Sequence, residues 1–229
     1  MAYHPWEYTA RFRTGYRADR RTALQLLGTL AVGAAAWGVT ETIGKTFTSP
    51  GSRRRFTGSH ERDSFVGYRF PSTSWINDDP KPIDPSSWNL NVDGEVREPL
   101  VLSYYDLLQG GRFQQIELVA TLDCTGGWYS TQCWSGVRVI DLCEAAGMYE
   151  GARSLTLTGV IGYSRRMPIS DAANLLLATH VGDEPLSHRH GAPVRLVAPD
   201  RRGFQWVKWV TLITVNSSPA WLQLPFPIE

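Results

Sequence analysis

The stretch TLDCTGGWYSTQCWSGVRVIDLCEAAG, residues 121–147, carries the strongest signals of local structure in the chain. Before Cys124, residues 116–123 alternate apolar and polar side chains, which predicts a strand that ends at this cysteine. Two glycines follow within three residues, and residues 137–146 then place apolar side chains at helical spacing, with Gly147 as the stop. The pattern predicts a strand, an open loop and a helix, with a thiol at the start of the loop.

Cys124 is the residue of this stretch with the most reactive side chain. A thiolate is a nucleophile and a soft-metal ligand, and glycines let a ligand approach the backbone closely. Composition alone still favours a buried structural cysteine over a ligand. The three cysteines, Cys124, Cys133 and Cys143, cannot all pair with one another, and neither a C-x-x-C nor a zinc-like Cys/His spacing is present. At least one thiol is therefore expected to be free, and we interpret Cys133 and Cys143 as structural.

The bulk composition is that of a globular protein without a strong charge bias. The 229 residues suffice for one substantial domain and a terminal appendage, and 42% hydrophobic with 20% charged residues argues against wholesale disorder. The net charge of +1 gives no indication of a nucleic-acid partner. The nine tryptophans suit a large pocket or an interface, although core packing is their usual role.

Short strands mixed with isolated helices are predicted after residue 70. Alternation or apolar runs predict strands over residues 88–92, 155–159, 193–198 and 207–215, and a short helix over 103–109. A further helix is expected from Ser170 to near Gly182, because Ala173, Leu176 and Leu177 are spaced as on a helix face. Without regular βαβ repetition, the predicted class is α+β with mixed sheets.

The N-terminal part of the chain has a different character. Residues 23–39 carry no charge and follow several arginines, among them Arg20 and Arg21, a pattern typical of a twin-arginine export signal. A single membrane anchor is the alternative, since about 17 apolar residues is the lower limit for crossing a bilayer. We therefore expect a signal or anchor over residues 1–43, a linker over 44–69 and the folded domain over 70–229, outside the cytoplasm in either case.

Three segments resemble the sulfite oxidase family. The stretch 121–147 is similar to the family's molybdenum-ligand segment, with Trp134-Ser135-Gly136-Val137 in the place of its W-x-G-V. HRHGAPVRLVAPDRRGFQWVKWVTLITV, residues 188–215, resembles the motif H/N-G-x-P-x-R-L-V-x-P followed by G-x-x-x-V-K-W, and SWINDDPKPIDPSSWNLNVDGEV, residues 74–96, looks like the family's entry strand. Two long motifs in the right order are a specific signal. The resemblance implies the molybdopterin-binding fold over roughly residues 70–220.

The resemblance also implies a cofactor and the residues that hold it. Cys124 would be the catalytic metal ligand of a molybdenum–molybdopterin cofactor, beside the dithiolene sulfurs of the pterin. Arg195 stands on an apolar strand, where a buried charge demands an anionic partner, whereas Lys208 alone could equally be solvated. Arginine and lysine suit the phosphate of a pterin tail. The positions that match cofactor contacts in the family are Thr158, Gly159, His190, Arg195, Gly203, Gln205 and Lys208.

The implied activity is oxygen-atom transfer by an exported enzyme on a small oxo-compound or a protein sulfoxide, with a membrane haem or cytochrome subunit as electron partner. Gly127 and Trp128 stand where sulfite oxidases have substrate-binding arginines, which weakens the case for sulfite. The alternatives are a non-catalytic cofactor-binding or electron-transfer subunit and an anchored structural domain without metal. Arg165 and Arg166 could bring charge to a substrate entrance, although a surface position is expected for both.

Overall fold

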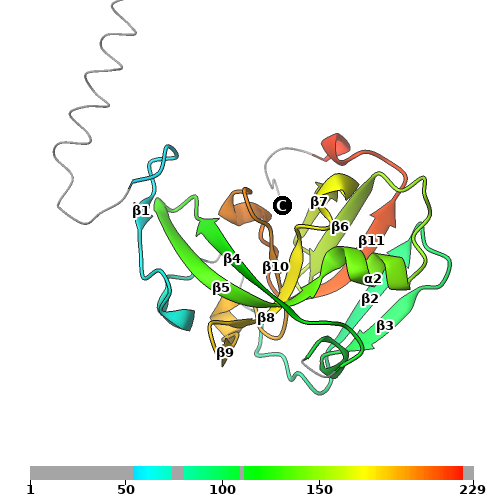
Figure 1. The fold of residues 1–229 in the computed structure, drawn as a ribbon, viewed down its shortest axis with the longest axis horizontal. Coiled ribbons are helices and arrows are strands. Elements are labelled where there is room, and N and C mark those ends of the chain that lie inside the picture. Colours follow the sequence, from blue (N-terminus) through cyan, green and yellow to red (C-terminus); the bar gives the residue numbers. More distant parts are fainter. Residues whose placement is uncertain (1–53, 74–79, 109–110, 224–229) are drawn as a thin grey trace, which may run out of the picture. The chain divides into compact units, whose positions relative to one another are not determined.

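Two β-sheets build the fold in the computed structural model, which describes residues 54–73, 80–108 and 111–223. The first sheet has six strands in the order β1-β5-β8-β10, with β4 beside β5 and β9 beside β8 (Figure 1). Its paired strands are antiparallel except for the short parallel contact of β1 with β5. The strands of this sheet are β1 (His60–Glu61), β4 (Ile116–Asp123), β5 (Trp128–Arg138), β8 (Leu176–Val181), β9 (Glu184–Pro185) and β10 (Arg195–Val197).

The second sheet has five strands in the order β3-β2-β11-β6-β7. The pair β2 and β11 is parallel, and the other neighbours are antiparallel. Strand β11, the last strand among the described residues, lies between β2 and β6 and so pairs with an early and a middle part of the chain. Its strands are β2 (Asn89–Gly94), β3 (Leu100–Ser103), β6 (Ser154–Gly159), β7 (Ser164–Pro168) and β11 (Val210–Asn216).

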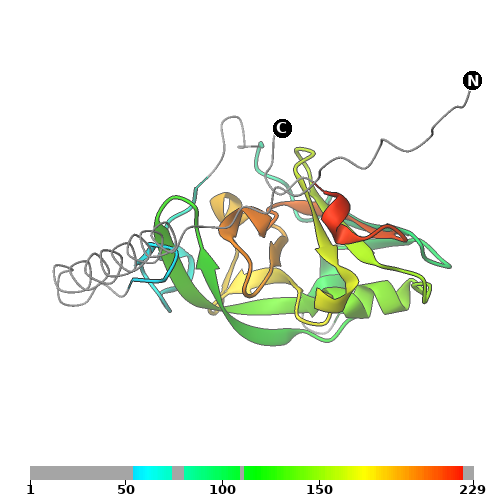
Figure 2. The same cartoon turned by 90° about the horizontal axis from the view of Figure 1, so that it is seen from above.

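Helices are few and short among the described residues. The α-helix α2 (Val139–Ala145) follows β5 directly and buries Val139, Leu142 and Cys143. Figure 2 shows β5 running from the cyan segment that holds β1 toward α2, so that one continuous stretch spans the molecule. The remaining helices are single 3-10 turns: η1 (Gly67–Arg69), η2 (Tyr105–Leu107), η3 (Ile169–Asp171), η4 (His188–His190), η5 (Gly203–Gln205) and η6 (Ala220–Leu222).

The core lies on the inner faces of these sheets and under α2. In β2 the side chains alternate, with Leu90 and Val92 buried between exposed or half-buried neighbours. Strand β8 differs, because both of its faces are covered and five of its six residues are buried. Removal of this apolar area from water is the main stabilising contribution, at about 25 cal/mol for each Å² buried.

The α+β class and several predicted elements agree with the structure. The strand predicted for 116–123 is β4, and the helix predicted for 137–146 contains α2. The helix predicted from Ser170 to near Gly182 is wrong, because residues 176–181 form β8, a central strand paired with β5 and β10. Burial on both faces gives β8 a continuous apolar run, which does not distinguish a strand from a helix.

Residues 54–69, which the sequence predicts as linker, are packed on the first sheet. His60 and Glu61 pair with the start of β5, and the backbone N–H groups of Arg62 and Phe65 donate to Tyr129 and Thr131. This pairing is made by backbone hydrogen bonds and the side chains show little periodicity, so the hydrophobic pattern of the sequence does not reveal the strand. The expected signal or anchor of residues 1–43 lies outside the described residues. Within the part of the chain that is described, no helix is long and apolar enough to span a membrane.

Candidate active site

A cavity of about 220 Å³ opens at the end of β4, where the chain turns at Cys124. Three stretches that are distant in sequence meet there: residues 70–73, the loop 124–128, and the region 190–208. Five of the predicted site residues line it, namely Cys124, His190, Arg195, Gly203 and Lys208. Its other walls include Phe70, Pro71, Ser72, Thr73, Leu122, Thr125, Gly126, Trp128, Phe204 and Trp206.

The loop around Cys124 is a tight turn that holds its sulfur at the cavity wall. The Cys124 N–H donates to Trp128 O at 2.8 Å, and the Gly127 N–H donates back to Cys124 O at 3.3 Å. The Gly126 N–H points at Sγ at 3.3 Å, and Sγ lies 3.5 Å from Thr73 Oγ1. Gly127 has a φ of +84°, which favours glycine. These contacts fix the position of the sulfur at the cavity wall.

Arg195 brings a positive charge to the wall of the cavity while being only 2% exposed. Its guanidinium lies over the rings of Trp134 and Trp206, 5.2 and 5.6 Å from their centroids, and Nη1 donates to His190 O. Its Nε has no hydrogen-bond partner among the described residues. Burial lowers the pKa of Arg195 to about 9, so the side chain remains charged at pH 7. A buried cation with an unused donor is costly unless an anion completes its contacts.

His190 lines the same cavity, but both of its ring nitrogens already have partners. Nε2 lies 2.9 Å from Phe70 O and Nδ1 lies 2.7 Å from Ser187 Oγ. Since a carbonyl only accepts, Nε2 carries the proton and Nδ1 accepts from the Ser187 hydroxyl. Burial, and next the nearby positive charges of Arg195 and Lys208, lower the pKa of His190 to about 4 against the hydrogen bond to Phe70. His190 is therefore neutral at pH 7, and its hydrogen bond to Phe70 O holds this part of the cavity wall in place.

Lys208 reaches across to the wall formed by Ser72 and Thr73. Its Nζ donates to Ser72 Oγ at 3.1 Å and to Thr73 O at 3.0 Å, and it lies 5.1 Å from the Trp209 ring centroid. Ser72 and Thr73 are not among the site residues predicted from the sequence. Neither residue belongs to a charged or motif-like pattern, and only the fold brings them to Cys124 and Lys208.

The remaining predicted site residues differ in their distance from the cavity. Gly203 lines it, and a Cβ on Gly203 would lie 3.1 Å from Asp123 O and Cys124 Cα, so glycine permits this close approach. Gln205 does not line the cavity; its Oε1 accepts from the Arg202 N–H and closes the η5 turn. Thr158 and Gly159 lie on β6, also away from the cavity lining, although Gly159 allows the backbone of Lys208 to pass closely.

Two further sets of residues that the sequence singled out do not line the cavity. Cys133 and Cys143, like Cys124, are free thiols, and burial raises the pKa of Cys143 to about 12, in keeping with a structural role. Arg165 is not the surface residue that the sequence predicts, since it is 4% exposed. Its guanidinium lies over the rings of Tyr163 and Phe204 and its Nε donates to the Tyr163 hydroxyl, whereas its Nη2 has no hydrogen-bond partner among the described residues.

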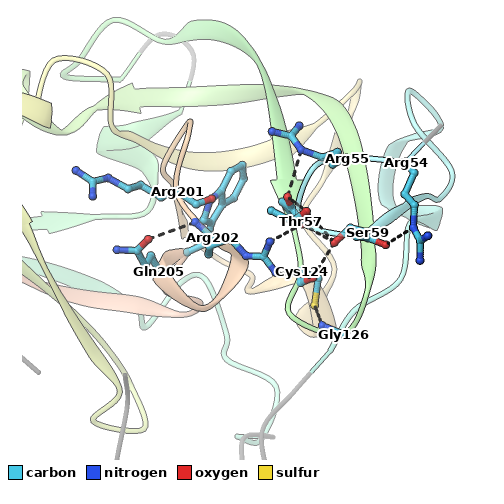
Figure 3. Close-up of polar contacts among 12 residues, drawn as sticks. Arg54, Arg55, Thr57, Ser59, Cys124, Gly126, Arg201, Arg202 and Gln205 are labelled. Atoms are coloured by element: carbon cyan, nitrogen blue, oxygen red, sulfur yellow. Dashed lines mark hydrogen bonds and ion pairs between the residues drawn. The ribbon is translucent and has the colours of Figure 1, made fainter. Parts of the chain in front are cut away.

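Behind the cavity, the residue before the cysteine collects a dense set of polar contacts. The buried Asp123 carboxylate accepts hydrogen bonds from Thr57 and Ser59 and pairs with Arg55 and Arg202. Figure 3 labels these four partners around Cys124. These partners come from two segments far from β4 in the sequence. Among the described residues, no group of three or more His, Cys, Asp or Glu side chains that could hold a metal ion occurs.

Comparison with known proteins assigns this arrangement to a family. The model of the oxidoreductase molybdopterin binding domain matches residues 77–221. The chain belongs to this family. The match contains the cysteine loop and the segment of Arg195 and Lys208, but it begins after the cavity wall of residues 70–73. The membership of the molybdopterin-binding oxidoreductase family that the sequence predicts is thereby confirmed.

Relatives of the molybdopterin-binding family differ in length and in the activity that they carry. The chain is 35% identical over 130 residues to the uncharacterized oxidoreductase YuiH of Bacillus subtilis (strain 168), a match that covers 56% of this chain and 64% of YuiH. It is 30% identical over 165 residues to the NAD(P)H nitrate reductase of Hordeum vulgare, covering 58% of this chain and 18% of that enzyme. The sulfane dehydrogenase SoxCD of Paracoccus pantotrophus has a TM-score of 0.56 at 25% identity, over 60% of this chain and 40% of that one. The matches therefore cover less than two thirds of each relative.

Family membership implies a molybdenum–molybdopterin cofactor, and the residues of the cavity fit such a group. Cys124 offers one soft sulfur ligand, the kind of donor that suits a metal already bound by dithiolene sulfurs. The unused Nε of buried Arg195 is the donor that an anionic cofactor would satisfy. Gly126 presents no side chain beside the thiol, where a Cβ would lie 3.5 Å from Cys124 Sγ.

Proposed function

We propose that this protein is an exported molybdenum-cofactor-dependent oxidoreductase that performs oxygen-atom transfer on a small oxo-compound or a sulfoxide. The observation that carries the proposal is the shared cavity of the Cys124 thiol and the buried Arg195, whose Nε lacks a partner among the described residues. A structural cysteine would not need a buried guanidinium at the same cavity.

The residues of the cavity divide the work of holding the cofactor. Cys124 would bind the metal, and the charges of Arg195 and Lys208 would hold the anionic part of the pterin. When bound, the cofactor supplies the oxygen-atom transfer and the redox change, while the protein supplies binding, orientation and electrostatics. Phe70, Trp134 and Trp206 pack edge to face behind Arg195 and exclude water from its charge.

The substrate side of the cavity favours a neutral oxo-compound over sulfite. Gly126, Gly127 and Trp128 follow the ligand cysteine, so the loop presents no cationic side chain. The Thr73 hydroxyl lies beside this loop, 3.5 Å from Cys124 Sγ and 3.3 Å from Trp128 Nε1. A hydroxyl beside an aromatic ring suits a polar S=O or N–O group on an apolar body, as in a sulfoxide.

Export and the electron partner are proposed from the sequence. The arginine pair and the uncharged run of residues 23–39 support translocation or anchoring outside the cytoplasm. The resemblance to the exported bacterial branch of the family supports a separate membrane haem or cytochrome subunit as electron carrier.

The test uses the full chain produced in a molybdenum-supplied host. Elemental analysis should find stoichiometric molybdenum, and a screen with a reduced or oxidised dye as electron carrier should show turnover with sulfoxides in preference to sulfite. Nitrate is included because nitrate reductases are among the relatives. Folded protein without molybdenum would contradict the proposal. Bound molybdenum without turnover on any oxo-donor or acceptor would instead favour a non-catalytic cofactor-binding subunit.

A further inference from the structure

The Asp123 carboxylate is the most heavily contacted polar group behind the cysteine loop. Oδ1 accepts from Ser59 Oγ at 2.7 Å, and Oδ2 accepts from Thr57 Oγ1 at 2.8 Å. The guanidinium groups of Arg55 and Arg202 lie 3.2 Å from Oδ2 and 3.4 Å from Oδ1. Each carboxylate oxygen thus has one hydroxyl and one cation, and the residue is only 4% exposed.

The same partners also reach the backbone of Cys124. Ser59 Oγ and Arg202 Nη2 each lie 3.4 Å from Cys124 O. Gly203, which follows Arg202, packs against Cys124 Cα, and residues 123 and 202 form a parallel β-bridge. Figure 3 shows the sulfur of Cys124 on the far side of this network, beside Gly126. The backbone of the cysteine is therefore fastened to two separate segments, residues 55–59 and 202–203.

Fold stability alone does not account for such an arrangement. A buried carboxylate loses its hydration, and replacement of a whole buried ion pair by apolar residues is often neutral or stabilising for a fold. The arginines are about one third exposed, so their ion pairs contribute less than buried pairs would. What the network does provide is a fixed geometry, because four donors converge on one small side chain next to the sulfur-bearing residue.

We propose that Asp123 is the positioning residue for Cys124. Through their contacts with Asp123, residues 55–59 hold the cysteine loop in place at the cavity. The inference rests on the proposed function, since the geometry matters when the thiolate binds metal. Partners behind a ligand commonly fix its orientation and tune the metal. Residues 55–59 lie before residue 77, where the family match begins, so this support is an addition to the matched domain.

The test is the Asp123→Asn variant of the full chain, measured by its metal content and by the EPR spectrum of the partly reduced protein. Asparagine keeps the size but turns one acceptor into a donor that faces a hydroxyl and a guanidinium. The g values depend on the orientation of the cysteine sulfur at the metal, so we expect them to shift. Molybdenum retention should weaken about 10-fold to 100-fold.

Asp171→Asn is the matched control. Asp171 forms an ion pair with Arg201, the neighbour of Arg202, but makes no contact with Cys124. This variant loses a carboxylate–arginine pair from the same loop and should keep the wild-type g values and metal content. A shift as large in Asp171→Asn as in Asp123→Asn would overturn the proposal, because it would reflect general loosening of the loop.

If Asp123→Asn does not fold, the single variants Ser59→Ala and Thr57→Val decide the matter, since each removes one hydroxyl donor. Ser59→Ala also removes a contact to Cys124 O and should shift the g values more than Thr57→Val. Unchanged g values in both folded variants would refute the positioning role. Failure of the proposed function is distinguishable, because the wild-type protein itself would then contain no molybdenum.

Discussion

The two sides of Cys124 differ in how completely their polar groups are satisfied. Behind the loop, both oxygens of Asp123 have a hydroxyl and a cation as partners. On the cavity side, Arg195 is equally buried, yet its Nε has no partner among the described residues. The difference is that the protein itself satisfies one of these buried ions, whereas the other keeps a donor for the cofactor proposed above.

Removal of the Cys124 sulfur should have the largest effect on metal content and activity. Cys124→Ser replaces a soft thiolate by a hard, neutral hydroxyl, so we expect molybdenum content and dye-linked turnover to fall more than about 100-fold. Thermal unfolding should change little, since serine fits the same turn. Full activity in this variant would show that Cys124 is not the metal ligand, whereas Cys143→Ala should keep its metal.

Removal of the Arg195 charge should weaken cofactor binding without destabilising the fold. Arg195→Met keeps much of the length between Trp134 and Trp206 but removes the buried charge. We expect a loss of about 2–5 kcal/mol in cofactor binding, because the anion loses its buried partner.

The stability of the cofactor-free protein separates this prediction from a structural role. Without the cofactor, Arg195→Met should be at least as stable as wild type in urea unfolding, because a buried cation lacking a full set of partners is costly. A clear destabilisation of the cofactor-free variant would mean that Arg195 is a structural residue rather than a cofactor-binding one.

A smaller effect concerns His190, which fastens the wall at Phe70. Its folded pKa of about 4 lies below the ordinary value of 6.5, so protonation favours the unfolded chain. Its contribution to stability is fully present above pH 6.5 and declines as the pH falls toward 4. Between pH 7 and pH 5.5 this amounts to about 1 kcal/mol. Urea unfolding of His190→Asn at both values should lack this part of the pH dependence; an unchanged dependence would contradict the assignment.

Prediction from sequence succeeded where side chains report burial on one face. Residues 116–123 alternate because β4 is half-buried, and residues 139–145 show one apolar stripe because α2 covers a sheet. It failed at β8, whose two buried faces remove the alternation. The stretch 128–138 was not predicted as a strand, although it forms β5, the longest strand described.

Site residues could be predicted only where the local sequence has a recognisable chemical pattern. Arg195 could be singled out, because a cation on an apolar strand requires an explanation, and its burial is confirmed. Asp123 could not, since a polar residue at the end of an alternating strand looks ordinary. Ser72 and Thr73 reach the cavity through contacts with Lys208 and Cys124 that span more than 50 positions, and no local pattern records such contacts.

The wall of residues 70–73 is encoded separately from the motifs around Cys124 and Arg195. Apart from the Ser72 hydroxyl, its tie to Lys208 is made by the backbone carbonyl of Thr73, which any residue would supply. Exchange of this short stretch would reshape the entrance while the cofactor motifs stay intact. Because Phe70 O accepts from His190 and Thr73 Oγ1 lies 3.5 Å from Cys124 Sγ, a change in these four residues would alter the entrance and the surroundings of the thiol together.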